Sequence, residues 1–363
     1  MTTRYRPTWA EINLDHLWHN YQEAASYVTG KTVIPVIKAN AYGHGAVEVM
    51  KHLYHHGVRF FAVSLLEEAL ELRKINDDID ILMLGPVMVQ DLKICSKKRI
   101  EFTIYDFEIA EAVLHSKYTL TCHLKVDTGM NRYGITEPNI IIETIDRMQA
   151  ASHIHLKGLF THFATANENE EFYMNQLNRM NTIIRSIKKL PEMIHISNSS
   201  STFKYEFQIP YTTHVRLGIS LYGLSLDLDQ PDIKPVMKLQ SKVVQIKTLK
   251  PGDCVGYGAS YCAKEQEKIA ILPIGYADGF LRRNKSGFVE IHQKKYKIVG
   301  IVCMDACFIK IDDTIQVGDA VTLFGGIITI DDVARRLNTI NYEVITSISS
   351  RVPRVYITSH KGE

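Results

Sequence analysis

The sequence predicts an α/β protein in which a (β/α)8 barrel of the TIM type is followed by a mainly β C-terminal domain. Over the first two thirds of the 363 residues, short apolar runs alternate with longer amphipathic segments. Near residue 235 this pattern changes to short runs broken by turn residues, as in a β domain. The chain is long enough to bury two cores. We therefore assign residues 1–235 to the barrel and 236–363 to the second domain, on which residues 1–13 can also pack.

Eight apolar runs are the candidate barrel strands, and each precedes a helix-like segment or a tight turn. The clearest helix-like segment is 171–190. There Leu177, Met180 and Ile184 recur at steps of three and four and form one apolar face. The segment 65–75 has the same spacing. The candidate strands are Val33–Ile37, Arg59–Val63, Ile79–Leu84, Glu101–Ile104, Leu120–Val126, Leu156–Thr161, Met193–Ser197 and His214–Arg216.

The second domain is predicted from short apolar runs bounded by turn residues. Residues 251–253 and 317–319 are typical of turns that enter strands. A short helix is expected over Asp331–Leu337, and Arg351–Tyr356 closes the chain as a strand. The other candidate strands are Val243–Leu249, Ile269–Pro273, Phe288–Ile291, Ile298–Cys303, Phe308–Ile311 and Val321–Phe324.

Composition excludes several classes of partner. The 42 Lys and Arg residues nearly balance the 40 Asp and Glu residues, and no basic run suggests nucleic acid or an anionic membrane. The first residues lack the apolar core of a signal peptide, and no stretch approaches the roughly 20 apolar residues of a membrane helix. We therefore expect a cytoplasmic protein that acts on a small molecule.

The six cysteines do not predict a metal site. Only Cys303 and Cys307 lie close together, and no second pair completes a zinc site. We expect them to be reduced core thiols, and we assign no metal to the protein.

Polar residues stand repeatedly at the carboxyl ends of the candidate barrel strands, where active sites of such barrels form. They are Lys38, Lys125, His162, His195, Asn198, Ser199 and Arg216. Lys38 ends a buried apolar strand in the segment VIKANAYGHG, a position that is costly unless the lysine is paired, neutral or covalently engaged. Lysine forms Schiff bases with carbonyl cofactors. A structural lysine at a strand end is the alternative.

The segment VIKANAYGHGA resembles the pyridoxal-phosphate lysine motif of the alanine racemase family. The similarity covers nearly the whole chain and includes KVDTGMNRYG, GLFTHFATA, HISNSS, RLGISLYG, VGYGASY, PIGYADG, CMD and TINYEV in the family's order. The resemblance implies a barrel followed by a β domain, and interconversion of L-alanine and D-alanine with pyridoxal 5'-phosphate, supplying D-alanine for peptidoglycan. It also implies a head-to-tail homodimer in which each site combines one subunit's barrel with its partner's β domain.

The resemblance assigns two catalytic bases. Lys38 resembles the lysine that holds the cofactor and moves a proton on one face of the substrate. Tyr257 matches the second base, which the partner subunit supplies on the opposite face. Taken alone, Tyr257 is one of 18 tyrosines, and a half-buried strand aromatic is its alternative.

Further residues resemble the family's cofactor anchors. Arg216 resembles the arginine that faces the pyridine nitrogen, which then stays unprotonated because a guanidinium accepts no hydrogen bond. His195 is expected to orient Arg216, and His162 to pack against the ring; for either histidine alone, a structural role is the alternative. The expected phosphate and neighbouring contacts are Tyr42, Leu84, Asn198, Ser199, Gly218, Ile219 and Tyr342.

Arg132 resembles the arginine that holds the substrate carboxylate, assisted by the backbone of Met304 from the partner, with Asp305 in support. Lys125 matches a position that is carbamylated in a number of relatives. A buried lysine beside Arg132 would be repelled, whereas a carbamate would pair with it.

The sequence departs from the family pattern at four places, which are Asn131 (commonly Gly), 166–167, 200–201 and Ala306 (usually Gln). None removes a base or a cofactor anchor. Asn131 and Ala306 flank the expected substrate-carboxylate region, so these two concern substrate identity and rate. Three alternatives stay open: a racemase of serine or of a broader set of amino acids, a noncatalytic pyridoxal-phosphate carrier, and a decarboxylase on a similar fold.

Overall fold

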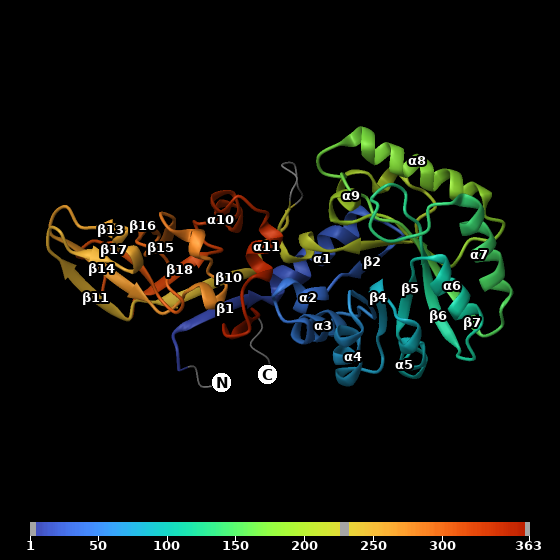
Figure 1. Cartoon of the computed structure of the whole chain (residues 1–363), viewed down its shortest axis with the longest axis horizontal. Coiled ribbons are helices and arrows are strands. Elements are labelled where there is room, and N and C mark those ends of the chain that lie inside the picture. The colour runs from blue at the N-terminus through green and yellow to red at the C-terminus, as the bar shows by residue number, and fades with distance from the viewer. Residues whose placement is uncertain (1–4, 226–231, 360–363) are drawn as a thin grey trace. The chain divides into compact units, whose positions relative to one another are not determined.

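The computed structural model of the chain describes residues 5–225 and 232–359, which form two compact units (Figure 1). We call them the barrel unit and the β unit. Counting only the described residues within each range, the barrel unit consists of Leu17–Ala41 and Gly45–Lys234, and the β unit of Met1–His16, Tyr42–His44 and Pro235–Glu363.

Parallel strands close into a ring in the barrel unit. Strands β3 to β8 pair in sequence order, and β2 pairs with β9. Val36 bridges Ala62 next to β3, and the Arg216 amide donates to the Ser197 carbonyl at 3.1 Å, so both seams are joined. The predicted (β/α)8 barrel is therefore confirmed. The strands are β2 (Thr32–Pro35), β3 (Phe60–Val63), β4 (Asp80–Pro86), β5 (Glu101–Ile104), β6 (Leu120–Lys125), β7 (Ile154–Phe160), β8 (Met193–His195) and β9 (His214–Leu217).

Helices connect these strands, and the longer ones bury an apolar face. In α8 the predicted face of Leu177, Met180 and Ile184 is buried, and the Asn169 side chain caps the helix by accepting the Phe172 amide. Among the described residues, none of the helices has both the length and the apolar character needed to cross a membrane. The helices are α1 (Leu14–Tyr27), α2 (Lys38–Tyr42), α3 (Ala46–His55), α4 (Leu66–Ile75), α5 (Leu92–Lys98), α6 (Phe107–Leu114), α7 (Pro138–Ala150), α8 (Glu170–Ser186) and α9 (Ser199–Lys204).

The β unit is built on one large sheet, with strand order β11-β14-β17-β16-β15-β18-β10-β1-β19, and on the ribbon β12-β13. The mainly β second domain is therefore confirmed. Its strands are β1 (Thr8–Asn13), β10 (Met237–Lys242), β11 (Gln245–Leu249), β12 (Cys254–Val255), β13 (Tyr261–Cys262), β14 (Glu267–Leu272), β15 (Phe288–Ile291), β16 (Lys294–Val299), β17 (Cys307–Ile311), β18 (Ala320–Phe324) and β19 (Arg354–Ile357). Its helices are α10 (Ile330–Leu337) and α11 (Asn341–Thr346).

One predicted strand of this unit is wrong in its bounds. The run Ile298–Cys303 was expected to be a strand, but β16 covers Lys294–Val299. Gly300 takes a φ of 71°, a left-handed conformation in which a strand cannot continue. The apolar run therefore crosses the end of the strand.

The cysteines divide into two kinds. Cys303 and Cys307 are free thiols, and Cys307 is buried. Cys254 and Cys262 lie directly opposite each other in β12 and β13 and form a disulfide. The expectation of reduced core thiols is therefore wrong for these two exposed cysteines, whose pairing depends on the register of two very short strands and not on their spacing in the sequence.

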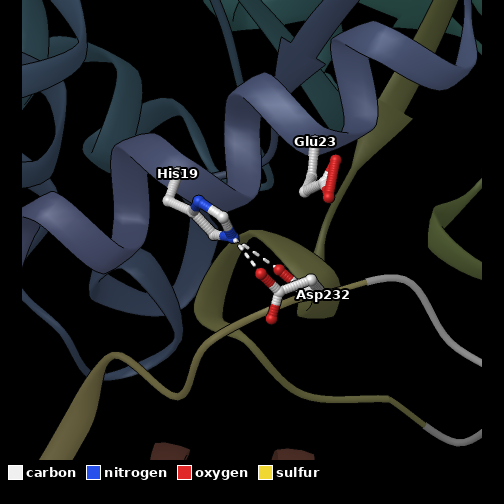
Figure 2. Close-up of side chains that lie close together, drawn as sticks. All are labelled: His19, Glu23 and Asp232. Atoms are coloured by element: carbon white, nitrogen blue, oxygen red, sulfur yellow. Dashed lines mark hydrogen bonds and ion pairs between the residues drawn. The ribbon is translucent and has the colours of Figure 1, made fainter.

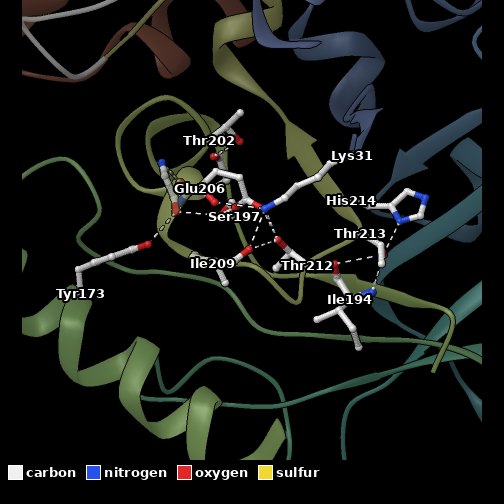
Figure 3. Close-up of polar contacts among 12 residues, drawn as sticks. Lys31, Tyr173, Ile194, Ser197, Thr202, Glu206, Ile209, Thr212, Thr213 and His214 are labelled. Atoms are coloured by element: carbon white, nitrogen blue, oxygen red, sulfur yellow. Dashed lines mark hydrogen bonds and ion pairs between the residues drawn. The ribbon is translucent and has the colours of Figure 1, made fainter. Parts of the chain in front are cut away.

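A buried ion pair lies between the segments that lead into the first and last barrel strands (Figure 3). Lys31, just before β2, donates to Glu206 Oε1 at 2.7 Å and to Thr212 Oγ1, just before β9, at 2.8 Å. The other carboxylate oxygen of Glu206 accepts the Ser197 hydroxyl. Glu206 is buried, so these contacts compensate a charge that would otherwise be costly there.

We predict that Lys31→Met destabilises the protein by about 3 kcal/mol, because Glu206 then keeps a buried charge without its cation. The matched control is Lys51→Met, whose pair with Glu48 is exposed and is expected to contribute about 0.5 kcal/mol. Urea unfolding of both variants gives the comparison. Equal destabilisation by the two substitutions would contradict the assigned role of the buried pair.

Candidate active site

Most of the predicted site residues lie at or just beyond the carboxyl ends of the barrel strands. Because parallel strands of a barrel end on the same face, these side chains share one end of the barrel unit. Lys38 follows β2, Leu84 lies in β4, Lys125 ends β6, His162 follows β7, His195 ends β8 and Arg216 lies in β9.

The charges at this end of the barrel act on one another. Burial lowers the pKa of Lys38, and the Arg132 and Arg216 cations lower it further. Burial also lowers the pKa of Lys125 to about 7, again with Arg132 and Arg216 contributing. The pKa of His162 lies well below its ordinary value, because of burial and the same cations. The site is therefore electropositive, which favours anionic ligands and neutral amines.

Lys38 begins a turn with an unusual backbone. Ala39, Asn40 and Ala41 all have φ between 51° and 53°, the left-handed region, which costs about 1–2 kcal/mol per non-glycine residue. Hydrogen bonds hold the turn. Glu68 in α4 accepts the Ala39 amide at 2.6 Å, and the Asn40 side chain accepts an amide from the start of α3 at 2.8 Å. Strain held in this way at a strand end is typical of functional sites.

Arg216 is buried, and its guanidinium is held by acceptors from neighbouring strands. It donates to the Thr161 carbonyl at 2.7 Å, to His195 Nδ1 at 2.9 Å and to His162 Nδ1 at 3.3 Å. Burial lowers the pKa of Arg216 to about 9, although the Glu206 carboxylate opposes this shift. Both predicted histidines therefore lie within hydrogen-bond distance of the Arg216 guanidinium.

The segments after β8 and β9 meet in a corner rich in hydroxyls. Asn198 caps α9 by accepting the Ser201 amide at 3.1 Å, and α9 begins at Ser199. Ser199 Oγ accepts the amides of Gly218 at 3.0 Å and Ser220 at 3.4 Å, which leaves its proton to donate to an anion. Ile219 begins the 3-10 turn Ile219–Tyr222.

Ser220 also lies in this corner, although the sequence motifs did not single it out. Its hydroxyl is buried and has no hydrogen-bond partner within residues 5–225 and 232–359. A buried hydroxyl of this kind normally bonds to water, an ion or a ligand, so Ser220 is an additional candidate for anion contact.

The loop after β6 presents Arg132. The Asp127 carboxylate accepts the amides of Gly129 at 2.8 Å, Asn131 at 3.1 Å and Arg132 at 3.0 Å. Asn131 has a φ of 54°, a conformation that Gly and Asn adopt most readily. This backbone conformation accommodates asparagine as well as the glycine that the family resemblance leads us to expect at this position.

In the β unit, two predicted tyrosines lie together. The ring centroids of Tyr42 and Tyr342 are 6.0 Å apart. Burial, followed by the effect of Tyr342, raises the pKa of Tyr42. Tyr42 therefore keeps its hydroxyl proton at neutral pH and can donate it.

The other predicted site residues of the β unit, Tyr257 and Met304, are exposed. The Tyr257 side chain is 69% exposed and lies in the loop closed by the Cys254–Cys262 disulfide. Met304 is 52% exposed, and the adjacent Asp305 accepts a hydrogen bond from Arg351 at 2.6 Å.

A separate polar group lies on α1 and the segment that follows residue 231. Ligand atoms of His19, Glu23 and Asp232 lie within 4.8 Å of one another (Figure 2). His19 Nε2 already contacts the backbone oxygen of Asp232 at 2.5 Å and its carboxylate at 3.4 Å. The side chains are partly or fully exposed, so we describe the group as a hydrogen-bonded surface cluster outside the candidate site.

Comparison with known proteins gives matches over both units. Residues 12–226 match the family described as alanine racemase, N-terminal domain, and residues 236–356 match alanine racemase, C-terminal domain. An alanine racemase of Geobacillus stearothermophilus is 38% identical and covers 98% of this chain and 95% of that protein. A crystal structure of alanine racemase from E. faecalis has a TM-score of 0.93 at 34% identity, covering 98% and 100%. A structure of a histidine racemase from Leuconostoc mesenteroides has a TM-score of 0.90 at 27% identity, covering 98% and 99%.

The lowered pKa of Lys125 makes its amine a candidate for carbamylation. With a pKa of about 7, the amine is mostly neutral at pH 8 and can add CO2, which forms a carbamate anion and releases a proton. We predict a protein-bound carbamate signal in ¹³C NMR with ¹³C-bicarbonate at pH 8. The signal should weaken towards pH 6, because Lys125 is then protonated.

Lys125→Ala should remove this signal, whereas Lys51→Ala, which changes a half-exposed surface lysine, should leave it intact. A signal that survives in Lys125→Ala, or its absence from the unsubstituted protein at pH 8, would refute the modification.

Proposed function

The chain belongs to the alanine racemase family, and we propose that it interconverts L-alanine and D-alanine with pyridoxal 5'-phosphate bound at Lys38. One observation carries this proposal: Lys38, Lys125, Arg132 and Arg216 lie within electrostatic reach of one another at one end of the barrel. This arrangement offers an amine of lowered pKa beside cations suited to a phosphate and a carboxylate.

The residues present fit pyridoxal 5'-phosphate. When bound, this cofactor supplies an aldehyde that a lysine amine can join and a ring that withdraws electrons from the α-carbon. We expect Lys38 to supply the amine, and Ser199, Gly218 and the Ser220 hydroxyl, which has no partner among the described residues, to hold the phosphate. Arg216 would face the ring nitrogen as a donor. The other proposed cofactor contacts are Tyr42, Leu84, His162, Asn198, Ile219 and Tyr342.

Racemisation removes the α-proton from one face of the substrate and returns a proton to the other, so it requires two acid/base groups. We assign Lys38 to one face, since its lowered pKa increases the neutral fraction that can accept a proton near neutral pH. We assign Tyr257 of the partner subunit to the other face. The 69% exposure of Tyr257 on the isolated chain supports a role in a site completed by assembly.

Substrate binding is assigned to Arg132, which Asp127 positions through its backbone. We propose that the backbone of Met304 from the partner assists, with Asp305 and its Arg351 contact holding that segment. A head-to-tail homodimer follows from this assignment. The family resemblance further supports a cytoplasmic enzyme that supplies D-alanine for peptidoglycan.

Substrate choice has one supported alternative. A protein named histidine racemase has this fold at 27% identity, so racemases of other amino acids share the architecture. Asn131 and Ala306 are the departures nearest the substrate assignment. The match of residues 236–356 to the C-terminal family domain argues against a carrier built from the barrel alone.

We predict that the purified protein with pyridoxal phosphate converts L-alanine to D-alanine faster than it converts L-serine, as measured by chiral chromatography. Lys38→Ala should lose both cofactor colour and turnover. Preference for serine would replace the substrate assignment, and no racemisation of any amino acid would overturn the proposed function.

We predict that Tyr257→Phe keeps the cofactor colour but loses at least about 100-fold in turnover, because one acid/base group is missing. Exchange of the α-proton in deuterated water should be affected differently in the two directions. Tyr27→Phe, at another exposed tyrosine, is the matched control. Equal turnover of the two variants would remove Tyr257 from the mechanism.

A further inference from the structure

A continuous chain of buried polar side chains leads from Arg216 into the barrel interior. Arg216 Nη1 lies 2.9 Å from His195 Nδ1, and His195 Nε2 lies 2.9 Å from His123 Nδ1. His123 Nε2 lies 2.8 Å from Glu101 Oε2. Both histidines are 0% exposed, and Glu101 is 5% exposed. We call Glu101, His123, His195 and Arg216 the interior chain.

Arg216 at one end of the interior chain and Glu101 at the other determine which ring nitrogen of each histidine carries its proton. Arg216 can only donate, so His195 Nδ1 must accept and the proton of His195 must be on Nε2. His195 Nε2 then donates to His123 Nδ1, which places the proton of His123 on Nε2, facing Glu101. An ionised carboxylate only accepts, so Glu101 completes the series. All the hydrogen bonds run in one direction, from Arg216 to Glu101.

The far end of the interior chain is an ion pair. The second oxygen of Glu101 accepts a hydrogen bond from Lys157, which also lies 3.4 Å from Asp80. Burial acts to raise the pKa of Glu101, but His123 and Lys157 together hold it below its ordinary value. Glu101 is therefore an anion, and Lys157 occupies the oxygen that does not face His123.

Strand β7, next to β6, leaves space for the His123 ring at Gly158. A Cβ on Gly158 in β7 would lie 2.0 Å from His123 Nδ1, so no larger residue fits beside this ring. Glycine weakens the interior of a strand, and here it leaves the space that the ring requires. This observation is independent of the hydrogen-bond distances.

We propose that Glu101 and His123 are positioning residues for the reaction: they hold His195 in the one tautomer that accepts a hydrogen bond from Arg216. The inference rests on the proposed function, in which Arg216 faces the cofactor's ring nitrogen. A guanidinium held in place keeps that nitrogen unprotonated. If it moves, the nitrogen can take a proton and the ring becomes a stronger electron sink, which favours transamination of alanine to pyruvate and of the cofactor to its amine.

Glu101→Gln tests the chain of tautomers. The Lys157 ammonium can only donate, so the carbonyl oxygen of the introduced amide faces Lys157 and the amide NH2 faces His123. His123 must then accept at Nε2 and carry its proton on Nδ1, which reverses its tautomer. Adding Lys157→Met frees the amide carbonyl to accept from His123 and should restore the original tautomer.

The readout is long-range ¹H–¹⁵N NMR of the full chain labelled with ¹⁵N-histidine, with and without pyridoxal phosphate. We expect Nε2–H forms of His123 and His195 in the wild type and in the double variant, and an Nδ1–H form of His123 in Glu101→Gln. Glu192→Gln is the matched control, because Glu192 pairs with His155 at 2.7 Å on the surface. It should change neither interior histidine.

The same variants are then tested with alanine and bound cofactor. Glu101→Gln should lower kcat about tenfold with little change in KM, and raise the fraction of cofactor converted to its amine about tenfold. Adding Lys157→Met to Glu101→Gln should reverse both effects. An Nδ1–H form of either histidine in the wild type, or unchanged tautomers and cofactor conversion in Glu101→Gln, would overturn the inference. Wild-type tautomers as expected without any racemisation would instead contradict the proposed function alone.

Discussion

Burial of the Arg216 guanidinium is the constraint on which the rest of the site depends. A buried cation is tolerated only when its donors meet acceptors and a counter-charge lies near. Here the acceptors are the Thr161 carbonyl and the two histidines that follow β7 and end β8. Because these groups come from different strands, Arg216 can be satisfied only when the ring of strands is closed.

The Glu206 carboxylate contributes both to the closure of the barrel and to the electrostatics of the site. Glu206 pairs with Lys31 beside β2 and accepts the Ser197 hydroxyl beyond β8, and its charge also opposes the lowering of the Arg216 pKa. Glu206 therefore stabilises the seam of the barrel and favours the cationic form of Arg216. Burial also lowers the pKa of Lys38 and Lys125, so two amines of lowered pKa and a buried cation coexist at one end of the barrel.

Two site residues that the sequence predicts in the β unit differ in exposure from the buried ones in the barrel unit. Tyr257 and Met304 are exposed, in contrast to the buried groups of the barrel unit. The disulfide between Cys254 and Cys262 closes the short loop that carries Tyr257, which restricts the conformations available to this side chain. An exposed but constrained tyrosine is suited to a role in a site completed by a second subunit.

The sequence by itself determined the fold class, the strands of the barrel and the position of Lys38, because apolar periodicity and strand ends are local properties. The predicted runs Glu101–Ile104 and Phe288–Ile291 coincide with β5 and β15 for this reason. Only the tertiary structure decided what depends on residues far apart in the chain: the place of β1 between β10 and β19, the Glu68 contact that holds the turn after Lys38, and the interior chain from Glu101 to Arg216. Hydrogen bonds across a closed barrel join side chains that no local pattern relates, so their partners become visible only once the strands are in register.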